Sequence, residues 1–76
     1  MNDRIKIARG LHAGLLVCIT RASIGVPAGT IGLIVKAYRT GYNGRAPGAG
    51  IDIYDVRPLG SDRTVRRMSR DLEVVQ

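Results

Sequence analysis

The stretch Leu15–Tyr38 reads LLVCITRASIGVPAGTIGLIVKAY and decides the fold class. Two runs rich in Ile, Val and Leu, at Leu15–Arg21 and Thr30–Arg39, have the composition of β-strands. The segment between them contains Pro27, which fixes φ, and two glycines, which accept positive φ, so it is expected to turn. The sequence therefore predicts two consecutive strands joined by a loop.

Further elements are expected toward the C-terminus. They are strands at Ile51–Arg57, Arg63–Met68 and Glu73–Val75, and a single 3₁₀ turn at Ser69–Leu72. In the first of these strands, Ile51 and Ile53 alternate with polar positions, and the alternation then slips. A bulge or bend near Tyr54 would account for that slip.

Five short strands with a 3₁₀ turn before the last one predict an all-β fold, a small SH3-like barrel. Such a barrel removes the exposed edges that a flat sheet of this size would present. Gly32, inside the second strand, is expected to mark a bend or a close backbone approach. With 76 residues the chain allows one domain. We expect the barrel over residues 14–76 with a Gly-rich loop at 40–50, and an N-terminal segment over residues 1–13, where a strand is favoured over a helix.

Two segments carry a family resemblance. The stretch quoted above resembles the opening of KOW-type and other SH3-like barrels, in which a Gly-containing loop leads into a G-x-x-G-x-[VI] strand, here Gly29 to Ile34. The ending RTVRRMSRDLEVV, residues 63–75, is similar to their closing strand, 3₁₀ turn and last strand. The sequence of the two segments is also similar to that of small uncharacterised bacteriophage proteins. The resemblance implies a module that binds RNA or protein, although the long Gly-rich insertion at 40–50 departs from the KOW pattern.

Charge favours a polyanionic partner. Ten arginines and two lysines against six acids give a net charge of +6, and no acid occurs between Arg4 and Ile51. Arginine grips phosphate with two parallel hydrogen bonds and stacks on bases. Nucleic acid or an acidic protein surface would suit this balance. Ordinary solubility of a small domain is the alternative explanation.

The candidate nucleic-acid-binding residues combine cations with one aromatic ring. They are Arg39, Tyr42, Asn43, Arg45, Lys36 and Arg66. Four of them lie in or beside the Gly-rich loop, where a tyrosine flanked by cations could stack on a base. The alternative is a hairpin tip without a binding role. A second basic group consists of Arg63, Arg66, Arg67 and Arg70. The alternative to a binding role is that at least one of them forms a salt bridge with Asp62, Asp71 or Glu73. Arg66 and Arg67 are consecutive, so they should point to opposite faces of a strand.

Catalysis finds no support in the sequence. His12 is the only histidine, and no motif connects it to a nucleophile. Cys18 lies in a predicted strand and is expected to be a small buried apolar residue. Asp52 and Asp55 should lie on opposite faces of their strand, which disfavours a shared carboxylate site. We therefore expect no enzyme, no cofactor and no metal site.

The sequence favours a non-enzymatic module that binds nucleic acid. The alternative is a structural or adaptor protein that docks on other proteins, for example in a phage particle or a multisubunit assembly. The runs LLVCI and IGLIV are apolar on both faces, so residues such as Leu16 and Ile34 are expected to be exposed and to favour a protein partner or a homo-oligomer. No run is long enough to span a membrane and no signal peptide is recognised, so a cytoplasmic location is expected, the host cytoplasm if the protein is phage-encoded.

Overall fold

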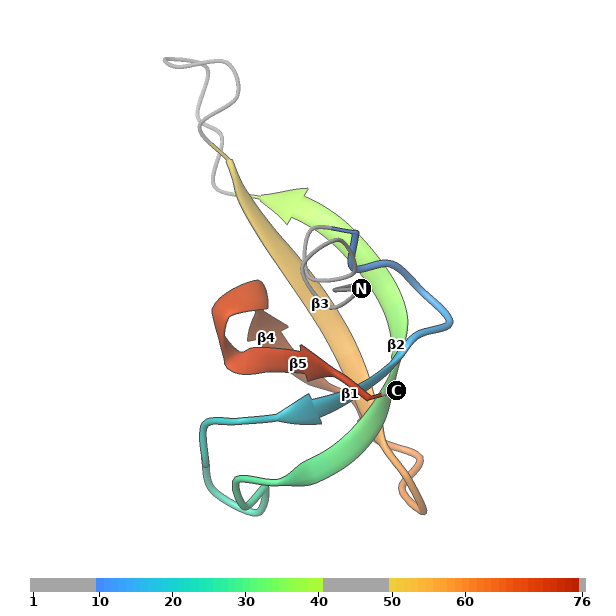
Figure 1. Cartoon of the computed structure of the whole chain (residues 1–76), viewed down its shortest axis with the longest axis vertical. Coiled ribbons are helices and arrows are strands. Elements are labelled where there is room, and N and C mark those ends of the chain that lie inside the picture. The colour runs from blue at the N-terminus through green and yellow to red at the C-terminus, as the bar shows by residue number, and fades with distance from the viewer. Residues whose placement is uncertain (1–9, 41–49, 76) are drawn as a thin grey trace, which may run out of the picture.

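The computed structural model describes residues 10–40 and 50–75, which form a five-stranded antiparallel sheet that curls into a small SH3-like barrel (Figure 1). The elements are β1 (Leu16–Ile19), β2 (Thr30–Thr40), β3 (Ile51–Pro58), β4 (Val65–Met68), the 3₁₀ turn η1 (Ser69–Asp71) and β5 (Leu72–Val74). Their order in the sheet is β4-β3-β2-β1-β5. The predicted fold class is confirmed, including the 3₁₀ turn before the last strand.

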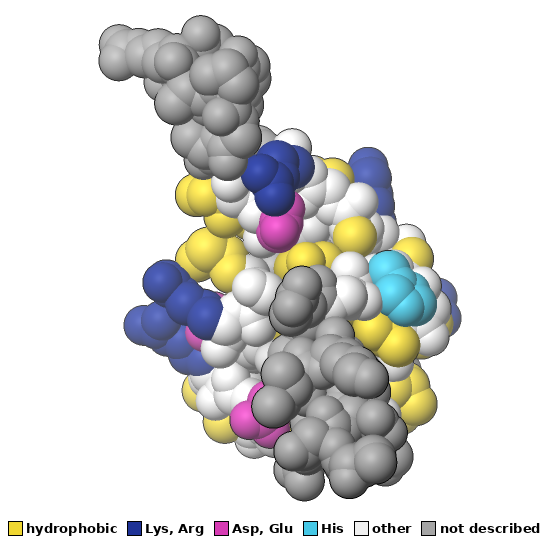
Figure 2. Space-filling view, turned by 45° about the horizontal axis from the view of Figure 1, so that its top comes forward, with side chains coloured by type: hydrophobic (Ala, Val, Ile, Leu, Met, Phe, Trp, Pro, Cys, Tyr) yellow, Lys and Arg dark blue, Asp and Glu magenta, His cyan; other side chains and the backbone are white. Residues whose placement is uncertain are grey.

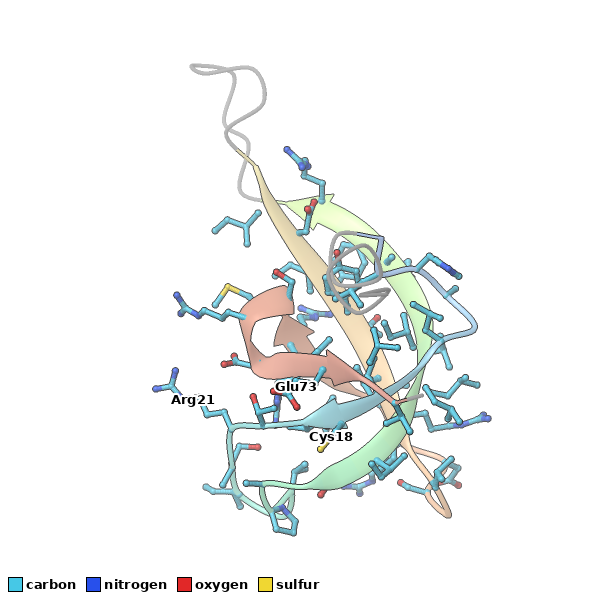
Figure 3. The ribbon with its side chains drawn as sticks, viewed as in Figure 1. Cys18, Arg21 and Glu73 are labelled. Atoms are coloured by element: carbon cyan, nitrogen blue, oxygen red, sulfur yellow. The ribbon has the colours of Figure 1, made fainter. Side chains whose placement is uncertain are left out.

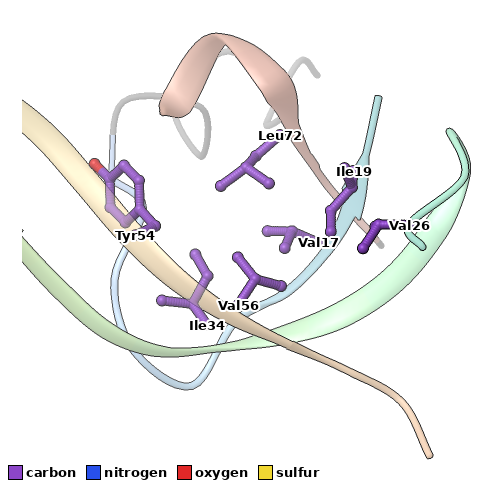
Figure 4. Packing of buried hydrophobic residues seen from close by; sticks show 7 residues of the cluster. All are labelled: Val17, Ile19, Val26, Ile34, Tyr54, Val56 and Leu72. Carbon is purple, nitrogen blue, oxygen red and sulfur yellow. The ribbon is translucent and has the colours of Figure 1, made fainter. Parts of the chain in front are cut away.

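The core consists of apolar side chains from β1, the β1–β2 loop, β2, β3 and β5 (Figure 4). The buried members are Val17, Ile19, Val26, Ile34, Tyr54, Val56 and Leu72. Four side chains at the edge of this cluster, Leu11, Leu15, Val65 and Val74, are partly buried against it. Each fully buried aliphatic side chain contributes about 1.5–3 kcal/mol of transfer free energy, so a core of this size leaves little stability to spare.

The alternation along β3 is unbroken, which corrects the expected bulge near Tyr54. Tyr54 and Val56 are both buried, whereas Ile51 is exposed and Ile53 half-buried on the opposite, outer face of the sheet. The irregularity lies instead in β2, where the register with β3 shifts between Ile34 and Lys36. The bulge was predicted on the assumption that Ile51 and Ile53 face the core, whereas Tyr54 and Val56 do.

Gly32 is required by the packing of β2 against β3. A Cβ atom built there would lie 2.6 Å from Cγ1 of Val56 and 2.9 Å from the carbonyl oxygen of Arg57. The close backbone approach expected from the sequence is therefore present. Ile34, two residues on, is fully buried, so the expectation that it would be exposed is wrong. Leu16 is 40% exposed, as expected.

The loop between β1 and β2 is folded back on the barrel. Ser23 and Val26 exchange two backbone hydrogen bonds of 2.9 Å, and Gly25 makes the turn with a φ of +78°. Val26 enters the core, whereas Ile24 at the tip is fully exposed. The loop begins at Thr20, whose backbone N–H donates to the carbonyl of Asp71 at 2.9 Å. This hydrogen bond holds the first half of the loop beside η1.

Cys18 is only half-buried, on the outer face opposite Ile31 and Glu73, which corrects the expectation of a core position.

Two expected segments lie outside the described residues. The expected N-terminal strand falls mainly on residues 1–9, and the Gly-rich loop falls on residues 41–49. Residues 10–13 are described and are not in a strand. In the described ranges no helix is long and apolar enough to cross a membrane.

Candidate functional site

An open cleft of about 460 Å³ lies where the β1–β2 loop faces the β3–β4 strands and η1. Its lining consists of Arg21, Ala22, Ser23, Ile51, Ile53, Arg66, Arg67, Met68, Arg70 and Asp71. Four arginines thus surround apolar side chains, with a single acid among them. Figure 2 shows basic side chains next to hydrophobic surface at the left edge of the molecule.

The arginines of the cleft come from three separate elements. Arg21 lies just after β1 and points away from the barrel (Figure 3), Arg66 and Arg67 lie in β4, and Arg70 lies in η1. Closure of the barrel brings the loop and η1 together, as the Thr20–Asp71 hydrogen bond shows. Arg21, Arg66 and Arg70 are exposed. Several guanidinium groups around one cleft create a local positive field that attracts anions.

Arg67 has a structural role in the cleft. It is half-buried, its Nη1 donates to the carbonyl oxygen of Arg66 at 2.7 Å, and its Nη2 donates to Oγ of Ser23. The side chain therefore connects β4 to the β1–β2 loop. Arg66 and Arg67 were expected to point to opposite faces, and they do pair with residues of opposite faces of β3, Asp55 and Tyr54 respectively. Both nevertheless line the cleft, because β4 is an edge strand of the sheet.

A cation–aromatic cluster on the outer face continues from the cleft. Nζ of Lys36 lies 5.2 Å and Cζ of Arg66 5.7 Å from the centre of the Tyr38 ring. The Tyr38 hydroxyl donates to Oδ1 of Asp55 at 3.3 Å, and Nε of Arg66 lies 3.5 Å from the same oxygen. The four residues belong to adjacent strands, since Lys36 pairs with Asp55 and Asp55 with Arg66. Two cations and one carboxylate leave this cluster with a net positive charge.

The structure therefore brings together two of the six predicted site residues. Lys36 and Arg66 lie on the outer face on either side of Asp55. Arg39 lies on the other face of β2, where its Nε is 3.0 Å from Oδ1 of Asp52. The remaining three, Tyr42, Asn43 and Arg45, lie outside the described residues. Asp52 and Asp55 do lie on opposite faces, and the acid that pairs with Arg66 is Asp55 rather than one of the three acids expected.

Sequence reasoning missed Arg21, Arg70 and Tyr38 as neighbours of this site. Arg21 and Arg70 are far apart in the chain, and the charge pattern alone does not place them together. The barrel topology does contain the signal, because a 3₁₀ turn leading into β5 must lie beside the end of β1 when these strands pair. Tyr38 follows Lys36 by two residues, which in a strand puts both on one face.

In the part of the chain that the structure describes, the pKa of Tyr54, on the inner face of β3, departs from its ordinary value. Burial raises the pKa of the Tyr54 hydroxyl above its ordinary value, the Asp52 carboxylate raises it further, and Arg39 opposes both. Tyr54 lines a smaller hollow with Leu11 and Ala37. Among residues 10–40 and 50–75, no three His, Cys, Asp or Glu side chains lie close enough together to hold a metal ion.

Comparison of the chain with protein-family models, with curated proteins and with solved structures finds no significant match. The cleft and the cation–aromatic cluster beside it are therefore the features of the molecule that indicate a function.

Proposed function

We propose that the protein is a non-enzymatic β-barrel module that binds nucleic acid at the arginine-lined cleft. The observation that supports it best is that one open cleft is lined by three exposed arginines, Arg21, Arg66 and Arg70, together with apolar side chains. Phosphate contacts by arginine supply most of the affinity of such modules, and apolar or aromatic surface supplies contacts to bases.

The cation–aromatic cluster extends this surface. Arg66 belongs to both features, since it lines the cleft and lies over the Tyr38 ring. Its side chain is 71% exposed despite the contact with Asp55. An exposed ion pair contributes about 0–1 kcal/mol to stability, so Arg66 can exchange its contact with Asp55 for one with a phosphate at little cost. Lys36, also exposed, adds a second cation on the same face.

The proposal is tested by titrating nuclease-treated protein into a fluorescently labelled single-stranded 12-mer and following anisotropy. At physiological salt we expect a Kd between about 1 and 100 µM, the range of sequence-independent binding. Arg66→Ser should weaken binding several-fold. Arg63→Ser removes the same charge from the β3–β4 connection, away from the lining of the cleft, and should change binding much less. Equal losses, or no binding by the unmodified protein, would contradict the proposal.

A second candidate function, association through an apolar face, has its own observation. Leu16 is 40% and Val75 39% exposed, and the two are neighbours because the N–H of Val75 donates to the carbonyl of Leu16 at 3.0 Å. Leu16 also pairs with Leu33, which is half-buried. We propose a second copy of the chain as the occupant of this face, in a homo-oligomer that would suit a structural or adaptor role.

Light scattering with and without nuclease treatment separates the two candidates. A mass above 8.2 kDa that persists after nuclease treatment, and falls in Leu16→Glu, would support self-association. A mass that falls to the monomer on nuclease treatment would support nucleic-acid binding instead. The two functions are compatible, since the Leu16 face and the cleft have no residue in common.

A further inference from the structure

The cleft has an apolar floor between its cations, and this combination is informative about the ligand. Ile51 is 48% exposed, and Ile53 and Met68 are half-buried, so apolar surface remains open in the middle of a strongly basic site. The exposed surface of a small protein contains single apolar side chains as a rule. Three that line one cleft with four arginines form a surface that suits a ligand with both an anionic and a flat apolar part.

We infer that the cleft binds single-stranded in preference to double-stranded nucleic acid, with one unstacked base seated against Ile53 and Met68. The inference rests on the proposed function and specifies its substrate class. In a duplex the base faces are stacked on one another, so a duplex offers phosphates to the arginines and no base face to the floor. A single strand offers both, because its bases can turn outward and its phosphates follow at each side.

The size and shape of the site agree with a single base. A cleft of about 460 Å³ falls within the range of pockets that enclose small ligands, and it is bounded by the β1–β2 loop on one side and by β4 and η1 on the other. A duplex keeps its base faces stacked inside the helix, so it would present its backbone to the cleft. A base with its flanking phosphates can reach the floor.

The chemistry of the floor also suits a base. Met68 provides a polarisable thioether, which makes favourable contacts with aromatic rings. Ile53 lies between Met68 on β4 and Tyr38 on β2 in the sheet register, so the floor continues into an aromatic side chain on the outer face. A second base of the same strand would therefore meet Tyr38, beside Arg66. We therefore expect the bound nucleic-acid strand to cross the sheet along the row Met68–Ile53–Tyr38.

The experiment compares a labelled 12-nucleotide oligothymidine with a labelled 12-base-pair duplex by anisotropy at one salt concentration. We expect the unmodified protein to bind the single strand at least about tenfold more tightly. Ile51→Ser and Met68→Ala should each weaken single-strand binding by about fivefold or more, with little effect on the duplex. Leu59→Ser is the matched control, because Leu59 is 63% exposed and does not line the cleft.

The results of this experiment separate the preference for single strands from the proposed function, nucleic-acid binding at the cleft. Equal affinities for the two ligands, or floor variants that bind the single strand as tightly as Leu59→Ser does, would overturn the single-strand inference and leave the proposed function standing. No binding of either ligand at low salt would overturn both. Tighter binding of polyglutamate than of oligothymidine at the same ionic strength would also overturn both and make the cleft a site for acidic peptides. Circular dichroism of Met68→Ala checks its fold, and Ile51→Ser, at an exposed position, gives an independent reading.

Discussion

The hydroxyl of Tyr38 donates a hydrogen bond to Oδ1 of Asp55 at 3.3 Å, between neighbouring strands of the outer face. The same oxygen accepts from Nε of Arg66 at 3.5 Å. Asp55 therefore holds the aromatic ring and the arginine in position and at the same time neutralises part of the positive charge at the site. Removing its charge should have the opposite effect on binding from removing an arginine.

Asp55→Asn should strengthen oligonucleotide binding, on the order of twofold to fivefold, because it removes a negative charge close to Arg66. Asp52→Asn is the matched control, since it removes one charge from the other face, where Asp52 pairs with Arg39. Anisotropy titrations of both variants at the same salt concentration test the prediction. A larger gain in affinity in Asp52→Asn than in Asp55→Asn would show that the oligonucleotide binds on the face of Asp52 and Arg39, and would contradict the proposed site.

Gly32→Val should lower the free energy of unfolding by about 1–3 kcal/mol or more, because its Cβ would overlap Val56 and the Arg57 carbonyl. Ala37→Val is the control, since it introduces the same side chain at an exposed position of β2. Urea denaturation measures both. If Gly32→Val has the midpoint of the unmodified protein, the close approach of β2 and β3 is not as described.

A charge in the core and a charge on the apolar face should have different consequences. Ile34→Glu places a carboxylate at a fully buried position, which costs several kcal/mol and should leave a small domain largely unfolded. Leu16→Glu places the same group at a 40% exposed position and should keep the fold. Circular dichroism melting curves distinguish them. A cooperative transition in Ile34→Glu near that of the unmodified protein would contradict the assignment of the core.

The stability of the protein should decline in alkali through Tyr54. Burial raises the pKa of this hydroxyl in the folded state, so the folded chain keeps the proton at pH values where the unfolded chain, with a tyrosine pKa of about 10, has lost it. The contribution is therefore complete below about pH 10 and is lost as pH rises toward the folded pKa. In Tyr54→Phe the melting temperature should fall less between pH 9 and pH 11. An equal fall in both proteins would show that Tyr54 is not responsible.

Most of the fold was predictable because glycine and proline mark the ends of the strands. The predicted strand at Thr30–Arg39 and β2 at Thr30–Thr40 differ by one residue. The face that β3 directs inward was not predictable from composition. Ile51 and Ile53 are the more apolar set, yet the core takes Tyr54 and Val56, because the register with β2 and β4 determines which set faces Ile34 and Val65.

The candidate site was predictable only in part, for a reason that lies in tertiary structure. Lys36 and Arg66 were recognised as basic strand residues, and pairing through Asp55 places them on one face. Arg21 and Arg70 line the same cleft only because β1 pairs with β5, which places η1 against the β1–β2 loop. A charge count along the chain carries no information on that closure.

The central claim is that the arginines of the cleft contact phosphates, and the salt dependence of binding tests it most directly. The measurement is the slope of log Kd against log salt concentration for a single-stranded oligonucleotide. Two double variants, Arg21→Ser/Arg70→Ser and Arg57→Ser/Arg63→Ser, both lower the net charge from +6 to +4. Only the first pair lines the cleft. Each lost phosphate contact lowers the slope by about 0.7, so the cleft pair should lower it by about 1.4 and the control pair by much less. Equal decreases in the two variants, or a slope near zero for the unmodified protein, would contradict the account.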